Sequence, residues 1–240
     1  MSAATRRWLL VCLTVPLWNP MCAVPGAVPG AAVATSTWPD GWVPRLEAQL
    51  LLQTLNAELL SHDSATVTLE HWCADHRLAS PSRIVAERVP GADKPLSEEQ
   101  RHELGVSAGE PVRYRRVRLR CGSLVLSEAD NWYVPGRLTA DMNHTLDTSD
   151  VPFGRVVQPL HFRRHTLSVR MLARLLPEAW EMSATVPGEE GGSLPLPAQV
   201  LEHRALLTLP EGTPISEVVE TYTANVLAFA PPERQCHCAH

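Results

Sequence analysis

Lysine is almost absent from this chain. Lys94 is the single lysine among 21 basic residues, and it lies in the turn-like stretch "PGADKP", a poor place for burial. Because Schiff-base catalysis needs a desolvated lysine, the sequence argues against that chemistry.

A surplus of positive charge is absent too. The formal net charge is -5 and the pI is near 6.1, so we do not expect nucleic acid as a partner.

The sequence also lacks an N-terminal apolar run long enough to span a bilayer. The run Trp8–Trp18 falls short of the roughly 20 residues that a transmembrane helix needs. It follows Arg6 and Arg7 and precedes "AVA" at 32–34, an order typical of a cleaved export signal. Cys22 follows "NPM", which lacks the small residues of a lipoprotein signal. We therefore predict a periplasmic or secreted protein without a stable membrane anchor, or a cytoplasmic one if the start is misassigned.

Three regions follow from this pattern. We predict a signal peptide or low-complexity leader over 1–34, one domain over 35–230, and a tail containing cysteine and histidine over 231–240. The chain is 45% hydrophobic and 20% charged, which is enough for one domain with a substantial core.

The mature chain keeps an even number of cysteines: Cys73, Cys121, Cys236 and Cys238. In an oxidising compartment this permits disulfides. Cys73 and Cys121 lie in apolar stretches, which favours buried thiols or one bridge over catalysis. The tail "CHCAH" could hold a metal, but its cysteines and histidines lie so close together that a full tetrahedral site would be strained, so we favour a frayed tail over a metal site.

Hydrophobic periodicity predicts an α+β fold of about six strands in antiparallel pairs with two to four helices. The expected helices are 45–62, 97–105 and 136–146. The stretch 65–72 is a strand or a short helix, and its Thr and Val content favours the strand. The other expected strands are 82–89, a hairpin of 112–121 with 124–134, and a final hairpin around "PEGTP". The stretch 155–172 is read as a helix or strand followed by a strand.

The hairpin "VRYRRVRLRCGSLVLSEADNWYVP" carries five arginines in its first nine residues. Because successive side chains of a strand point to opposite faces, Val117, Leu119 and Cys121 share one face. The other face carries Tyr114, Arg116, Arg118 and Arg120. Cross-strand pairing with Glu128 and Asp130 would neutralise some of these arginines. A guanidinium left over would suit a carboxylate ligand.

Glu220 is a second candidate for a site. It lies between Val218 and Tyr222 on one face of a predicted strand. Burial of a carboxylate there would cost free energy, and such buried carboxylates often mark functional sites. An exposed glutamate on an edge strand is the other reading.

Several motifs in this order resemble those of the chorismate pyruvate-lyase superfamily. They are "RRVRLRCG", "NWYVP", "DVPFG" (Asp150–Gly154) and "PEGTPISEVVETY", and "HDSATVTLEHW" is similar to the segment after that family's first helix. The resemblance covers 45–229. It implies a chorismate lyase-like antiparallel sheet of about six strands with helices packed on one side.

The resemblance implies specific residue roles. Arg116 would hold a carboxylate and Glu220 would contact the far end of the ligand, and both would serve catalysis. Phe153 and Ala65 would complete the substrate-binding wall, and Glu217 is the alternative to Glu220. No metal or organic cofactor is implied, because ring aromatisation drives the reaction and a shielding pocket supplies much of the rest.

Three functions follow as expectations. The first is a lyase that converts chorismate to 4-hydroxybenzoate and pyruvate. The second is an exported, non-catalytic protein that binds a small aromatic carboxylate, because effector-binding domains of bacterial regulators share this fold and fold does not fix function. The third is a structural protein whose pocket is filled by its own side chains, such as Trp132. The oligomeric state is left open.

Overall fold

A six-stranded antiparallel sheet dominates the computed structural model, which describes residues 33–34, 37–91, 93–182 and 191–231. The strand order is β2-β3-β4-β8-β7-β5. The strands are β2 (Ile84–Arg88), β3 (Arg113–Cys121), β4 (Leu124–Tyr133), β5 (Arg163–Met171), β7 (Gln199–Thr208) and β8 (Pro214–Thr223). Two-residue strands β1 (Val33–Ala34) and β6 (Leu196–Pro197) pair separately.

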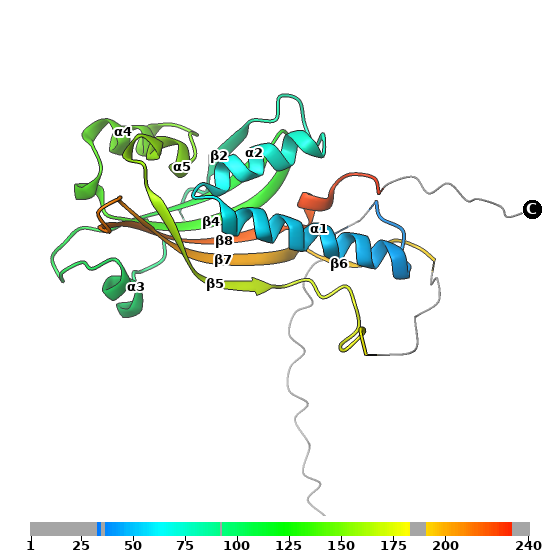
Figure 1. Cartoon of the computed structure of the whole chain (residues 1–240). Helices are drawn as coiled ribbons and strands as arrows, with labels where there is room; N and C mark the ends of the chain where they lie inside the picture. The colour runs from blue at the N-terminus through cyan, green and yellow to red at the C-terminus, as the bar shows by residue number, and fades with distance from the viewer. Residues whose placement is uncertain (1–32, 35–36, 92, 183–190, 232–240) are drawn as a thin grey trace, which may run out of the picture. The chain divides into compact units, whose positions relative to one another are not determined.

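Helices cover one face of this sheet (Figure 1). They are α1 (Trp42–Ser61), α2 (Ala65–Asp75), α4 (Ala140–Thr148) and the short α5 (Phe153–Val156). This confirms the predicted α+β architecture. The exception is α3 (Glu98–Glu103), which lies on the opposite face (Figure 1). We call these two surfaces of the sheet the inner face, under the helices, and the outer face.

The strand favoured for 65–72 is wrong, because this stretch forms the first two turns of α2. Its Thr and Val residues suggested alternation, but the buried residues Ala65, Leu69, Trp72 and Cys73 recur at helical spacing. Ser64 caps the helix by accepting a hydrogen bond from the Val67 amide at 3.4 Å. The packing of this apolar stripe therefore overrides the strand propensity of individual residues.

Local sequence signals set two further elements as expected. Ser97 and Gln100 form a capping box at the start of α3. The β3–β4 hairpin turns at Gly122, whose φ is 57° and where an added Cβ would lie 2.7 Å from Ala79 Cβ. Only glycine satisfies both the left-handed backbone and this close approach.

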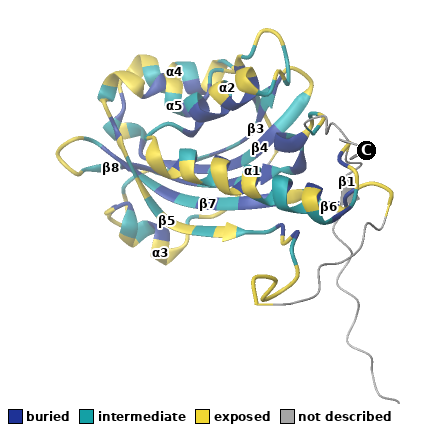
Figure 2. Cartoon of the chain, turned by 45° about the vertical axis from the view of Figure 1, so that its right-hand side comes forward, coloured by how far each residue is buried: buried dark blue, intermediate teal, exposed yellow. Residues whose placement is uncertain are grey.

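The main core lies between α1, α2 and the inner face (Figure 2). Within it, Cys73 of α2 and Cys121 of β3 form a disulfide, with Cα atoms 6.4 Å apart. Of the two readings left open by the sequence, the bridge is therefore the one observed. No helix in the described part of the chain has the length and apolar content needed to cross a bilayer.

The predicted leader, apart from the backbone of 33–34, and the "CHCAH" tail lie outside the described residues.

Candidate functional site

A cavity lies between the inner face, the start of α2 and the turn that leads into α5. Its volume is about 40 Å³, which is room for a few water molecules. Most of its wall is apolar. The strands contribute Val117, Leu119, Ala129, Leu207 and Val218, and segments outside the sheet contribute Phe153 and Phe162. This composition, with a few polar groups set into it, is typical of a small-molecule site.

Arg115 of β3 supplies the first charge in the cavity. It lies in one cross-strand row with Asn131 of β4 and Val218 of β8 on the inner face. The residue is 7% exposed. Its Nη2 donates long hydrogen bonds to the carbonyl oxygens of Ser149 (3.5 Å) and Val151 (3.3 Å).

The Arg115 guanidinium is incompletely satisfied. Its Nε is buried and has no hydrogen-bond partner among the described residues. Burial, reinforced by the neighbouring charge of Arg88, lowers the pKa of Arg115 to about 10, so it stays protonated at neutral pH. A buried cationic donor without a partner is costly, and an anion in the cavity would satisfy it.

Arg164 of β5 and Glu220 of β8 form an ion pair in the same cavity. Arg164 Nη2 lies 2.6 Å from Glu220 Oε2, and the two side chains are 4% and 8% exposed. Tyr222 donates its hydroxyl hydrogen to the same carboxylate oxygen at 3.1 Å. Burial alone would lower the pKa of Arg164, but the charge of Glu220, its hydrogen bond and the other nearby groups together raise this pKa. Arg164 Nε, like that of Arg115, is buried without a partner among the described residues.

His203 of β7 lies directly beside Glu220 in the sheet register. The residue is fully buried, and its Nε2 lies 2.8 Å from Asn56 Oδ1, so Nε2 carries the hydrogen. Burial, together with the charge of Arg164, lowers the pKa of His203 to about 4. The imidazole is therefore neutral at neutral pH and adds no charge to the site.

The N-terminus of α2 closes one side of the cavity with Ser64, Ala65 and Thr66. Gly154 lies against them, since a Cβ at this position would lie 3.1 Å from Ser64 Oγ and 3.3 Å from Thr66 Oγ1. The first amides of an α-helix lack partners within the helix and carry a partial positive charge. This helix end therefore adds to the positive potential that the two arginines create.

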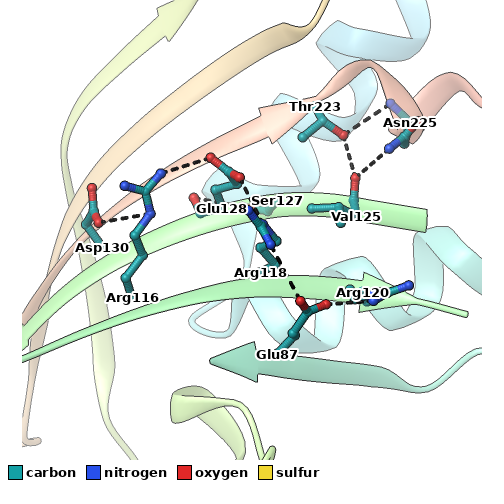
Figure 3. Close-up of polar contacts among 10 residues, drawn as sticks. All are labelled: Glu87, Arg116, Arg118, Arg120, Val125, Ser127, Glu128, Asp130, Thr223 and Asn225. Carbon is teal, nitrogen blue, oxygen red and sulfur yellow. Dashed lines mark hydrogen bonds and ion pairs between the residues drawn. The ribbon is translucent and has the colours of Figure 1, made fainter. Parts of the chain in front are cut away.

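Arg116 does not lie in this cavity, so the expectation that it meets Glu220 there is wrong. Arg116 shares its cross-strand row with Asp130, Val219 and Arg204, which lie on the outer face. Its Nη2 is 3.2 Å from Glu128 Oε2 and its Nε is 3.8 Å from Asp130 Oδ1. Figure 3 shows Arg116 between these two carboxylates.

The other outer-face arginines are paired in the same way. Arg118 lies 3.4 Å from Glu128 and 3.5 Å from Glu87, and Arg120 lies 2.6 Å from Glu87 (Figure 3). The cross-strand neutralisation by Glu128 and Asp130 is thus as the sequence suggested. The error at Arg116 is an error of strand parity. Glu220 shares its cross-strand row with Ala129 and Val117, so these three side chains lie on the inner face. On β3, Arg115 is two residues from Val117 and shares that face, whereas Arg116 points to the opposite one.

The structure brings Glu220, Phe153 and Ala65 together in the wall of this cavity. It separates Glu217 and Trp132 from them. Glu217 is fully buried on the outer face under α3, where its Oε1 accepts hydrogen bonds from Arg204 and Gln100. Trp132 packs against Leu104 on that outer face and donates to the Lys94 carbonyl, so it does not fill the cavity.

Sequence reasoning missed Arg115 and Arg164. Strand parity was a usable signal for Arg115, because residues 115, 117 and 119 of one strand point to the same face and Val117 and Leu119 are apolar. No comparable signal marked Arg164, whose strand pattern is polar on both faces. In the described ranges, no group of three or more histidine, cysteine, aspartate or glutamate side chains is placed to hold a metal ion.

The fold and site thus define an α+β protein with a small, cationic, largely apolar cavity under its helices. No family model matches the chain. A curated relative, the uncharacterized protein y4mC of Sinorhizobium fredii (strain NBRC 101917 / NGR234), is 55% identical over 196 residues, which cover 81% of this chain and 83% of that protein. The chain belongs to the same family as y4mC.

Comparison with solved structures finds transcriptional regulators at low identity. PhnF from Mycobacterium smegmatis is 13% identical, with a TM-score of 0.45, over 72% of this chain and 70% of that one. The ligand-binding domain of a putative GntR-family transcriptional regulator from Bordetella bronchiseptica is 19% identical, with a TM-score of 0.39, over 61% of this chain and 88% of that one.

Proposed function

We propose that this protein binds a small organic carboxylate, aromatic or of similar size, in the cavity under α2. The observation that carries the proposal is Arg115. Its buried Nε lacks a partner among the described residues and lies in a largely apolar wall. A carboxylate would accept hydrogen bonds from this guanidinium and from the first amides of α2, while the apolar walls would cover the rest of the ligand.

The far end of the ligand would meet Glu220. Its Oε2 accepts hydrogen bonds from Arg164 and Tyr222, and among the described residues no hydrogen bond to its Oε1 is observed. This oxygen can therefore accept a hydrogen bond from a hydroxyl or amine on the ligand.

A ring-sized ligand requires the cavity to widen. At about 40 Å³ the space is smaller than a benzene ring, for which a cavity of about 150 Å³ is known to suffice. Phe153 is the first residue of the short helix α5 and Phe162 directly precedes β5, so neither belongs to the sheet and their side chains are the natural ones to move. Replacing Phe153 with alanine should tighten the binding of ring-sized acids relative to acetate.

Thermal unfolding of the native protein with benzoate, 4-hydroxybenzoate and acetate tests this proposal. A ligand that binds only the folded state at about 100 times its Kd adds about 2.7 kcal/mol of stability, so a clear rise in Tm is expected with at least one of these acids. Equal Tm values with and without all three acids would refute binding. Benzamide, which has the shape of benzoate without its charge, is the matched control.

The lyase activity implied by the sequence resemblance is a second proposal for the same cavity. It differs from binding alone in one observable, because a chorismate lyase must release 4-hydroxybenzoate. Incubation with chorismate and detection of 4-hydroxybenzoate by its absorbance tests this directly. We favour binding over catalysis because the buried charges of the cavity leave one net positive charge, whereas chorismate carries two carboxylates.

A further inference from the structure

We propose, building on the carboxylate-binding function above, that the cavity selects ligands with a single negative charge and discriminates against dicarboxylates. The residue that sets this selectivity is Glu220, which already neutralises one of the two buried arginines. The site thereby presents one uncompensated guanidinium rather than two.

The buried charges of the cavity can be assigned one by one. Arg115 and Arg164 are positive and almost fully buried, and Glu220 is negative and paired with Arg164 at 2.6 Å. Arg115 has only backbone carbonyl partners. These three groups leave one net positive charge.

The remaining polar groups at the cavity do not change this balance. Asp63 also lines the cavity, where it accepts from the Arg164 backbone amide at 2.8 Å, and the exposed Arg163 guanidinium 3.3 Å away offsets its charge. Tyr222 keeps its proton, because burial and the charge of Glu220 raise its pKa well above the usual value. His203 is neutral, since its pKa lies near 4. Ser64, Thr66 and Asn131 carry no charge.

A second carboxylate on the ligand would therefore find no free cation. It would lie between apolar walls and close to Glu220, and a buried charge without a partner is strongly unfavourable. A monocarboxylate, in contrast, brings the buried net charge to zero. Chorismate carries two carboxylates, so the same balance argues against chorismate as the ligand.

The test compares ligands that differ in charge but hardly in size. Monomethyl terephthalate and terephthalate share one ring and two para substituents, but carry one and two negative charges at neutral pH. Calorimetric titration of the native protein should give a Kd at least tenfold lower for the monoester. Benzoate serves as the small reference acid.

Glu220→Gln provides the matched variant. It preserves the shape of the side chain and removes its charge, which leaves two buried guanidinium groups uncompensated. We expect the preference for the monoester to shrink at least tenfold or to reverse. Glu128→Gln, which removes a carboxylate from the outer face, should leave the preference unchanged.

The possible failures are distinguishable. If terephthalate binds the native protein as tightly as the monoester, the selectivity is refuted while carboxylate binding stands. If Glu220→Gln folds and keeps the native preference, Glu220 is not its source. If none of the three acids binds the native protein, the selectivity is refuted, and the proposed function fails with it unless acetate raises the Tm. The ratio of the two Kd values for the native protein can be measured whether or not the Glu220→Gln variant folds.

Discussion

Arg164 and Glu220 are joined by a buried ion pair that spans three strands. They belong to β5 and β8, which are separated in the sheet by β7, and their side chains meet on the inner face 2.6 Å apart. Tyr222 supports the carboxylate from the same strand. The pair fixes Glu220 as an ionised acceptor and holds the edge strand β5 against the cavity.

Breaking this pair from one side should be costly. Arg164→Met leaves Glu220 charged and buried without its partner, so we expect a loss of about 3–5 kcal/mol in the free energy of unfolding. The double variant Arg164→Met/Glu220→Leu removes both charges and should lose less. Urea denaturation of the four proteins in this cycle gives the coupling energy. A double variant that is as unstable as the sum of the single ones would contradict the pairing.

The disulfide between Cys73 and Cys121 should contribute strongly to stability. The two cysteines are separated by 48 positions in the sequence. For a loop of this length the chain-entropy model gives a stabilisation of about 4 kcal/mol. Because both cysteines lie in the core, the double variant Cys73→Ala/Cys121→Ala tests the bridge without leaving a free thiol. Thermal unfolding should show a large drop in Tm. A Tm that is the same for this variant and for the oxidised native protein would show that the bridge does not form in solution.

His203 should make stability fall in mild acid. Its pKa is lowered to about 4 by burial and by Arg164, whereas an unfolded histidine titrates near 6.5. The neutral imidazole therefore stabilises the fold above pH 6.5, and this contribution is lost as the pH falls towards 4. His203→Gln, which can still donate to Asn56, should flatten the decline of the unfolding free energy between pH 6.5 and 4. An identical pH profile for the native protein and the variant would count against this account.

Glu103 should have the opposite pH dependence. Glu99, Glu103 and Glu217 all contact the single guanidinium of Arg204, at 2.7–2.9 Å. Burial, together with the charge of Glu217, raises the pKa of Glu103 above its usual 4.5. The protonated form is therefore favoured in the fold, and its contribution, present below pH 4.5, is lost as the pH rises through the raised pKa.

Glu103→Gln tests this by mimicking the protonated side chain. We expect the variant to be as stable as the native protein or more stable at pH 7, with the difference vanishing below pH 4.5. Glu99→Gln is the matched control, because that side chain is 69% exposed and its charge is screened by solvent. A Glu103→Gln protein that is less stable at pH 7 would show that Arg204 needs the full charge of Glu103.

Strand alternation in the sequence was sufficient to place the β3–β4 hairpin and to sort its faces. It also anticipated that Glu128 and Asp130 would pair with arginines on the outer face. What misled the choice of arginine for the cavity was the resemblance of "RRVRLRCG", which implied Arg116 instead of its neighbour Arg115. A shift of one residue on a strand changes the face, so parity with Val117 was the better guide.

The remaining parts of the site depend on contacts that are remote in sequence. Arg164 reaches Glu220 only because β5 pairs with β7 and β7 with β8, and its own strand has no clear apolar face. The start of α2 reaches the cavity because 65–72 is helical, although its Thr and Val content favoured a strand. Periodicity in a single segment cannot reveal such pairings.

Titration of benzoate into two single variants is the most direct test of the central claim, that Arg115 is the anion-binding group. Arg115→Gln and Arg116→Gln remove the same charge from adjacent residues on opposite faces of β3. A charge-assisted hydrogen bond is worth about 1.5–3 kcal/mol, so Arg115→Gln should raise the Kd for benzoate at least tenfold while Arg116→Gln leaves it unchanged. A Kd that rises for Arg116→Gln and not for Arg115→Gln would contradict the account.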